Sequence, residues 1–139
     1  MATIQTICIN VQAIPKSRPR FTSSGQVYTA SRTRNYEQCL KTAMKEQMLL
    51  QPFEKAVSLD LTFVFTPIKD KRKQKLIPNG DIDNLVKSVQ DAANGILYID
   101  DKQVNHLTAH KMYGDESKIV IKIWETIDDV PSLKIDELV

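Results

Sequence analysis

The chain has 139 residues, of which 42% are hydrophobic and 26% are charged, and its net charge at pH 7 is +2. This length and balance fit one soluble globular domain. No apolar run approaches the ~20 residues that span a bilayer, and the N-terminus lacks the apolar region of a secretory signal. We therefore expect no membrane association and residence in the cytoplasm.

The charges are divided unevenly along the chain. Residues 1–80 carry thirteen Lys or Arg and five Asp or Glu, whereas residues 81–139 carry six and twelve. Such a split indicates a basic surface for a polyanion and a separate acidic centre, although scattered solvated charge gives the same counts. Cys8 and Cys39 belong to no Cys/His cluster, which argues against zinc and predicts buried free thiols.

Residue patterns predict the regular elements of the first half. The β-branched residues 4–11 predict a strand, and a short hairpin is expected around Gly25. Apolar residues at helical spacing predict a helix over 35–50, and period-two alternation predicts a half-buried strand over 57–65. The basic residues, prolines and glycine of 67–80 predict a mobile, strongly basic loop.

In the second half the same patterns predict a helix over 83–94, with Gly95 as its C-terminal stop. The apolar residues 96–99 predict a short strand that runs back along this helix. Residues 103–113 and 118–125 predict a hairpin.

The order β, α, β, α, β, β predicts a single α+β domain with helices packed on one side of a mixed β-sheet. The domain is expected to span 1–125, followed by an acidic C-terminal tail, 126–139, of unknown role. The apolar residues 119–124 form either core or a dimer face. His106 and His110 have no third ligand nearby in the sequence, so they are interpreted as structural or surface residues.

Carboxylates gather around the second helix. Asp81 and Asp83 are two residues apart at its start and can point the same way, although either one can equally serve as a helix cap. The adjacent Asp100 and Asp101 follow the apolar run and, taken alone, are typical turn residues. If the predicted short strand returns Asp101 to the helix start, three carboxylates converge.

Converging carboxylates suit Mg²⁺ or Mn²⁺, because these ions prefer hard oxygen ligands. A metal ion of this kind binds a scissile phosphate and activates water. Lys87 lies four residues after Asp83 on the same helix face, where it stabilises transition-state charge, orients the attacking water, or is only part of a solvated face.

Three segments share their spacing with a known family: residues 80–87, 91–95 and 99–104. Their combined pattern, D-x-D-N-x-x-K, D-x-x-N-G and D-D-x-Q-V, resembles the RusA family of Holliday junction resolvases. The proline-containing basic segment 15–21 and the later residues 111–114 also resemble the family. The likeness covers about residues 4–125.

The resemblance implies a small homodimeric α+β endodeoxyribonuclease, of a kind often carried by phages and prophages. Such an enzyme cuts branched DNA, symmetrically at four-way junctions, with Mg²⁺ or with Mn²⁺. The family's catalytic residues fall on Asp81, Asp83, Asp101 and Lys87, and the three aspartates are the implied metal ligands. Asp91 and Asp100 match supporting positions, and Asp91 is spaced to orient Lys87.

Two basic segments are expected to hold DNA phosphates without reading sequence. For the second of them a solvated loop is the alternative. The predicted DNA-binding residues are Lys16, Arg18, Arg20, Lys69, Lys71, Arg72, Lys73, Lys75 and Lys111.

Two other functions remain open. A non-catalytic branched-DNA-binding module would keep the basic segments and would bind DNA in EDTA without cutting it. A metal-dependent enzyme that acts on nucleotides or another phosphorylated small molecule would not need the basic residues 69–75.

Overall fold

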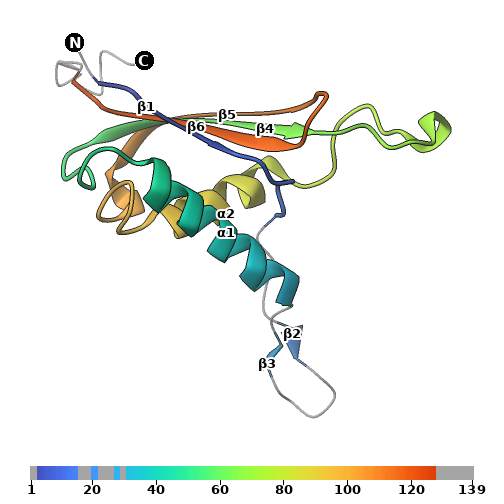
Figure 1. The fold of residues 1–139 in the computed structure, drawn as a ribbon, viewed down its shortest axis with the longest axis horizontal. Helices are drawn as coiled ribbons and strands as arrows, with labels where there is room; N and C mark the ends of the chain where they lie inside the picture. The colour runs from blue at the N-terminus through green and yellow to red at the C-terminus, as the bar shows by residue number, and fades with distance from the viewer. Residues whose placement is uncertain (1–2, 16–19, 22–26, 29–30, 128–139) are drawn as a thin grey trace, which may run out of the picture.

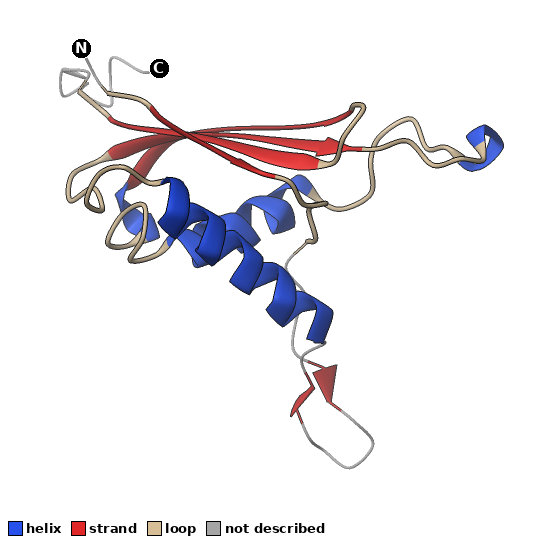
Figure 2. Cartoon of the chain, in the orientation of Figure 1, coloured by secondary structure: helices blue, strands red, loops and turns tan. Residues whose placement is uncertain are grey.

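A computed structural model describes residues 3–15, 20–21, 27–28 and 31–127, and for residues 20, 21, 27, 28 and 71 it describes the backbone alone. Two helices lie on one face of a four-stranded mixed sheet (Figures 1 and 2), which confirms the predicted α+β domain. The elements in chain order are β1 (Gln5–Ile9), β2 (Arg20–Phe21), β3 (Val27–Tyr28), α1 (Ser31–Gln47), β4 (Val57–Phe65), η1 (Lys71–Lys73), α2 (Ile82–Ala93), η2 (Asp101–Gln103), β5 (Val104–Tyr113) and β6 (Lys118–Glu125).

The sheet has the strand order β1-β6-β4-β5, with β4 between β6 and β5. Strand β4 pairs antiparallel with β6 and parallel with β5. The predicted hairpin of 103–113 with 118–125 is therefore wrong: both strands form, but β4 separates them. Strands β4 and β6 carry the buried apolar side chains, so their pairing buries more apolar surface than pairing β6 with the largely exposed β5.

The two-residue strands β2 and β3 pair antiparallel, with Arg20 opposite Tyr28. The hairpin predicted around Gly25 is therefore present in its two strands, while Gly25 itself lies outside the described residues. The acidic tail also lies outside them, apart from its first two residues. Thr126 still belongs to the folded domain, because its amide donates to the carbonyl of Ala56 at 2.9 Å.

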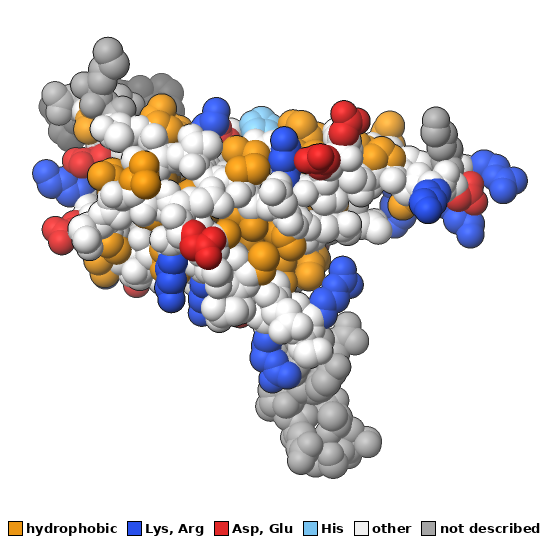
Figure 3. All heavy atoms as spheres, in the orientation of Figure 1, with side chains coloured by type: hydrophobic (Ala, Val, Ile, Leu, Met, Phe, Trp, Pro, Cys, Tyr) orange, Lys and Arg blue, Asp and Glu red, His pale blue; other side chains and the backbone are white. Residues whose placement is uncertain are grey.

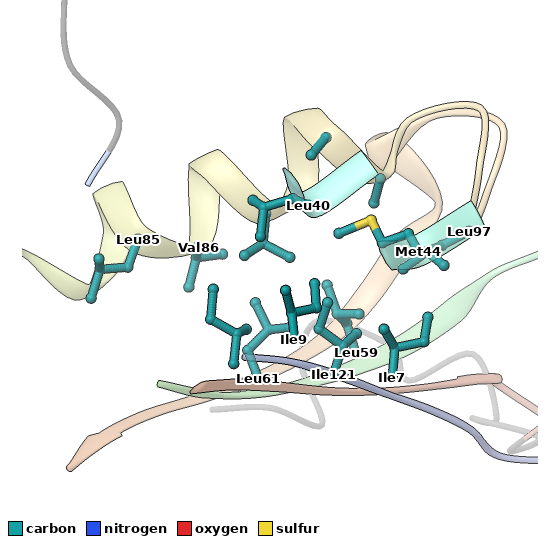
Figure 4. Close-up of a cluster of buried hydrophobic side chains, with 14 of the residues drawn as sticks. Ile7, Ile9, Leu40, Met44, Leu59, Leu61, Leu85, Val86, Leu97 and Ile121 are labelled. Carbon is teal, nitrogen blue, oxygen red and sulfur yellow. The ribbon is translucent and has the colours of Figure 1, made fainter. Parts of the chain in front are cut away.

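One hydrophobic core fills the space between the sheet and the helices (Figure 4). Its fully buried members include Ile7, Leu40, Met44, Leu59, Leu61, Leu85, Ile119, Ile121 and Ile123. The core interpretation of the 119–123 strand is therefore confirmed for Ile119, Ile121 and Ile123. Burial of each such side chain contributes about 1.5–3 kcal/mol. This packing fixes α2 against the sheet and leaves its polar face outward.

The side chains that point away from the core are open to solvent. Cys8 lies between the buried Ile7 and Ile9 on β1 and is exposed, as is Cys39 on α1. The prediction of buried thiols is wrong, because each cysteine falls on the solvent side of its element. His106 and His110 are exposed on β5, as expected for surface residues.

Beyond β4 the chain forms a projecting segment, residues 66–80, which we call the basic arm (Figure 1). The predicted basic loop is present, and it also contains η1 and internal hydrogen bonds. The Ile68 amide donates to Gln74 Oε1 at 2.8 Å, and Lys75 Nζ donates to Asn79 Oδ1 at 2.9 Å. Among the described helices, none is long and apolar enough to cross a membrane.

Candidate active site

Helix α2 begins directly after Asp81, which occupies its N-cap position. Gly80 precedes it with a φ of 100°, a conformation that favours glycine. The Asp81 carbonyl accepts the Leu85 amide at 3.0 Å, but its carboxylate makes no capping hydrogen bond. Asp83 follows in the first turn, and both aspartates are exposed. Asp81 therefore stands at the N-cap position, but its carboxylate does not cap the helix and is exposed, so it is accessible to a cation.

One turn further along α2, Lys87 forms an ion pair with Asp91, with 3.4 Å between Lys87 Nζ and Asp91 Oδ1. The expected pairing of these two residues is confirmed. Lys87 thus lies one turn after Asp83 and one turn before Asp91 on the same helix face. Because the pair is partly open to solvent, it contributes little to stability. It places the Lys87 ammonium beside the Asp91 carboxylate.

Residues 96 and 97 belong to a turn and Tyr98 forms only isolated β-bridges, with Phe53 and Asn94, so the predicted short strand is wrong. Gly95 ends α2 with a φ of 80°, as predicted for a stop, and the Ile96 amide donates to the Ala93 carbonyl at 2.9 Å. Four extended residues also cover only about 13 Å, less than the ~18 Å of a twelve-residue helix. A strand of this length would therefore not have carried Asp101 back along the whole helix. Asp101 instead begins η2, which packs against α2.

Asp100 caps η2, as its turn-forming interpretation predicts. Its carboxylate accepts the Lys102 amide at 2.9 Å. This hydrogen bond is the main cause that holds the pKa of Asp100 below its ordinary value. Asp100 therefore supports the turn that carries Asp101.

Asp101 is half-buried among the charged groups of α2. Desolvation is the main cause that raises its pKa, followed by the hydrogen bond with Asp100 and the charge of that residue. Asp91 adds to the rise, whereas Lys87 opposes it. The structure thus brings Asp101 close to Lys87 and Asp91, in a region of excess negative charge that a cation would relieve.

The described residues contain no group of three His, Cys, Asp or Glu side chains arranged to hold a metal ion. The expected convergence of Asp81, Asp83 and Asp101 is thus not present as a closed set of ligands in this part of the chain. The donor chemistry still fits Mg²⁺, because this ion is commonly held by one or two carboxylates, with water and substrate phosphates as its other ligands.

Two residues that the sequence analysis did not single out hold the turn before β5. The fully buried Tyr98 donates its hydroxyl to the Gln90 carbonyl at 3.1 Å. Burial, followed by the charge of the nearby aspartates, raises the pKa of its phenol. Gln103 Oε1 accepts two amides of the turn at 2.9 Å each, and its Nε2 donates to the carbonyls of Phe53 and Lys55 at 2.8 and 2.9 Å. A glutamine at capping-box spacing was the sequence signal for this role.

Lys111 and Tyr113 on β5 hold the end of the basic arm. Lys111 Nζ donates to the carbonyls of Pro78 and Gly80 at 2.9 and 2.6 Å. The Tyr113 hydroxyl donates to the Lys75 carbonyl at 2.9 Å. These bonds fix the residues that lead into α2. The ammonium predicted to bind DNA therefore already has two carbonyl acceptors.

The other predicted DNA-binding residues fall in two places. Lys16 and Arg18 lie outside the described residues, and Arg20 lies on β2. The second group is on the basic arm, where Lys71 lies in η1 and the exposed members are Lys69, Arg72, Lys73 and Lys75. Basic side chains gather at that end of the molecule in Figure 3. The cationic arm and the carboxylates of α2 are therefore neighbours in the chain.

Comparison with known proteins identifies the family of the chain. Residues 10–124 match the family model described as Endodeoxyribonuclease RusA. The chain is 35% identical over 104 residues to "Crossover junction endodeoxyribonuclease rusA" of Lactococcus phage r1t, which covers 72% of this chain and 78% of that protein. It is 44% identical over 45 residues, 32% of each chain, to "Uncharacterized protein YqaN" of Bacillus subtilis (strain 168). The chain therefore belongs to the RusA family of endodeoxyribonucleases, enzymes that hydrolyse phosphodiester bonds in DNA.

Proposed function

We propose that this protein is a structure-selective endodeoxyribonuclease that resolves Holliday junctions with Mg²⁺, or with Mn²⁺ in its place, in DNA recombination and repair. The observation that carries the proposal is the exposed pair Asp81 and Asp83, which begins α2 directly after the basic arm. A nuclease needs both parts, because cationic side chains neutralise DNA phosphates and carboxylates hold a metal ion. The name of the phage relative supports a DNA junction as the substrate.

Asp81 and Asp83 are the proposed metal ligands, and Asp101 is the proposed third ligand from the neighbouring turn. When bound, the metal ion supplies an activated water and stabilises the leaving oxygen. The N-terminus of α2 lies at the same place, and its unpaired amides and positive dipole end favour phosphate oxygens. The carboxylates would therefore hold the metal ion beside the helix terminus that favours a DNA phosphate.

Lys87 is the proposed source of positive charge on the reacting phosphate. Its ammonium is restrained by Asp91 at 3.4 Å and lies one turn beyond Asp83. A charge that is already positioned stabilises developing negative charge without further reorganisation. Asp91 is thus a positioning residue for Lys87.

Replacing Lys87 by Ala is expected to slow cleavage of a bound junction by about 10²–10³-fold. Junction binding is expected to change much less, because the basic arm supplies the main phosphate contacts. Single-turnover cleavage measures the first quantity, and a band-shift titration in EDTA measures the second. Lys45→Ala, at an exposed lysine of α1, is the control. Weakened binding at an unchanged cleavage rate would instead make Lys87 a DNA contact.

Lys111 is proposed to position the start of α2 rather than to bind DNA. Its two bonds to the carbonyls of Pro78 and Gly80 fix the backbone immediately before Asp81. Since Asp81 follows Gly80 directly, loss of these bonds would let the metal-binding carboxylate shift. A shift of this size matters, because catalysis depends on close positioning of the reacting groups.

Lys111→Met is therefore expected to lower kcat by about 10–100-fold, the usual cost of losing a group that orients a metal ligand, with a smaller change in KM. Lys111→Arg, which keeps charge and donors, should recover part of the rate. Lys122→Met, at an exposed lysine of β6, is the control. An unchanged kcat with a raised KM in Lys111→Met would support the DNA-binding role instead.

A homodimer is proposed because a four-way junction presents two equivalent strands to be cut, which a two-fold pair of active sites would match. Light scattering of the purified protein is expected to give twice the 15.8 kDa mass of one chain. A complex that contains a single protein chain per four-way junction would contradict a dimeric resolvase.

Three measurements distinguish a resolvase from the two rival functions: junction binding, activity on small phosphorylated molecules and junction cleavage. A binding module retains junctions in EDTA and never cuts them in Mg²⁺. An enzyme that acts on small phosphorylated molecules keeps its activity when Lys69, Arg72 and Lys73 are changed to Gln. A resolvase cuts a labelled junction in preference to a linear duplex of the same sequence, and it loses this activity in the triple variant.

A further inference from the structure

A hollow of about 370 Å³ lies between the basic arm and the body of the domain. It is lined by residues 12–15, by residues of the arm and by Arg32 of the first turn of α1. Its rim includes Gly80, whose Cα is about 3.8 Å from that of Asp81. The hollow therefore opens beside the carboxylates proposed to hold the metal ion.

The charged groups of the hollow suit an anion. Arg32, Lys73 and Lys75 line it, and none of the described residues that line it is acidic. The two lysines belong to the basic arm, whereas Arg32 belongs to α1. A phosphate inside the hollow would therefore meet cations from two separate segments of the chain.

The remaining surface suits a planar base. Phe65 and Tyr113 contribute aromatic surface, and Ile14 and Pro78 contribute apolar surface. Bases pack on such surfaces irrespective of their sequence, because every base has a π-face. The volume lies near the low end of the ~300–1,000 Å³ range of small-molecule pockets.

We propose that this hollow binds one unpaired nucleotide of the DNA strand beside the phosphate that is cut, and that it thereby favours branch points over linear duplex. The inference rests on the proposed junction-cutting function and adds a selectivity site to it. Extruding a nucleotide from a duplex costs unpairing and unstacking energy, which is lowest where pairing is already disturbed. A branch point offers such nucleotides, whereas a linear duplex does not.

The test measures binding in EDTA to four-way junctions that carry a single mismatch at each position flanking the branch. At one position the mismatch should tighten binding of the unmodified protein by at least about tenfold, because a mismatched nucleotide is cheaper to extrude. Gln12→Trp, which places a large side chain in the hollow, should abolish this gain. Gln51→Trp, at an exposed glutamine that does not line the hollow, should retain it.

Two arginines of α1 give a second, independent comparison. Arg32 lines the hollow and Arg34 does not, although both are exposed in the same turn of the helix. Arg32→Gln should weaken binding of the mismatched junction and reduce the slope of log K against log salt by about one. Arg34→Gln should leave both unchanged.

An equal gain from the mismatch in Gln12→Trp and in the unmodified protein would overturn the nucleotide site, and so would the absence of any gain. Cleavage of the fully paired junction in Mg²⁺ is measured alongside. If the junction is cut normally while the mismatch has no effect, only the nucleotide site is wrong. If no junction is cut, the proposed function fails, and the nucleotide site fails with it.

Discussion

Asp83→Asn is expected to abolish junction cleavage, with a fall of more than about 100-fold in the single-turnover rate, the upper end of the cost of losing a group that supports a metal ligand. The amide keeps the size of the side chain but removes the anionic oxygen that a Mg²⁺ ion prefers. Junction binding should persist or tighten, because a negative charge near the DNA phosphates is lost. Asp81→Asn and Asp101→Asn should give the same result.

Asp115→Asn is the matched control for these variants. It removes a carboxylate from an exposed residue between β5 and β6 that belongs to neither α2 nor η2. It should cut at the normal rate. Normal cleavage by Asp81→Asn, Asp83→Asn or Asp101→Asn would remove that residue from the metal site. Normal cleavage by all three variants would favour a catalytic centre elsewhere in the chain.

Gln103→Glu is expected to lower the free energy of unfolding by about 1–3 kcal/mol at neutral pH. The substitution keeps the shape of the side chain but replaces the Nε2 donor with an anionic oxygen. That oxygen would face the carbonyls of Phe53 and Lys55, which now accept hydrogen bonds at 2.8 and 2.9 Å. The turn that carries Asp101 should loosen, so cleavage should fall as well. Urea unfolding measures the loss of stability.

The destabilisation by Gln103→Glu should depend on pH. The two carbonyls and the neighbouring Asp100 oppose ionisation, so the new carboxyl has a higher pKa in the folded than in the unfolded chain. The loss of unfolding free energy is therefore smallest below the pKa of about 4.3 that a glutamate has in the unfolded chain. It grows as the pH rises through the higher pKa of this carboxyl in the folded chain. Gln38→Glu, at an exposed glutamine of α1, is the control. An equal loss in both variants, or a loss that is the same at pH 4 and pH 7, would contradict the role of Gln103.

The sequence predicted those elements whose pattern is local. Strand 57–65 was predicted to the residue from its alternating residue types. Its predicted half-burial was wrong, because seven of its nine positions are buried in this central strand. The helix after Asp81 and its stop at Gly95 were predicted from apolar spacing and a glycine that adopts a positive φ. Strand pairing was not predictable in this way. The position of β4 between β5 and β6 depends on contacts between distant segments, and the local signals favoured a hairpin.

The candidate site shows the same division. The pairing of Lys87 with Asp91 follows from helical spacing and was predicted. The position of Asp101 depended on the path of residues 96–99, where a turn replaces the expected strand. The hydrogen bonds of Lys111 to the carbonyls of Pro78 and Gly80 join segments more than thirty residues apart, so no local pattern revealed them.

The measurement that tests the central claim most directly is cleavage of an end-labelled four-way junction by the unmodified protein, in Mg²⁺ and in EDTA, with Asp83→Asn alongside. We expect paired nicks at symmetric positions near the branch, in Mg²⁺ only, and no nicks from the variant even where it binds the junction. Retention of the junction without scission in either buffer, or equal scission by Asp83→Asn, would contradict a metal-dependent resolvase built on the carboxylates at the start of α2.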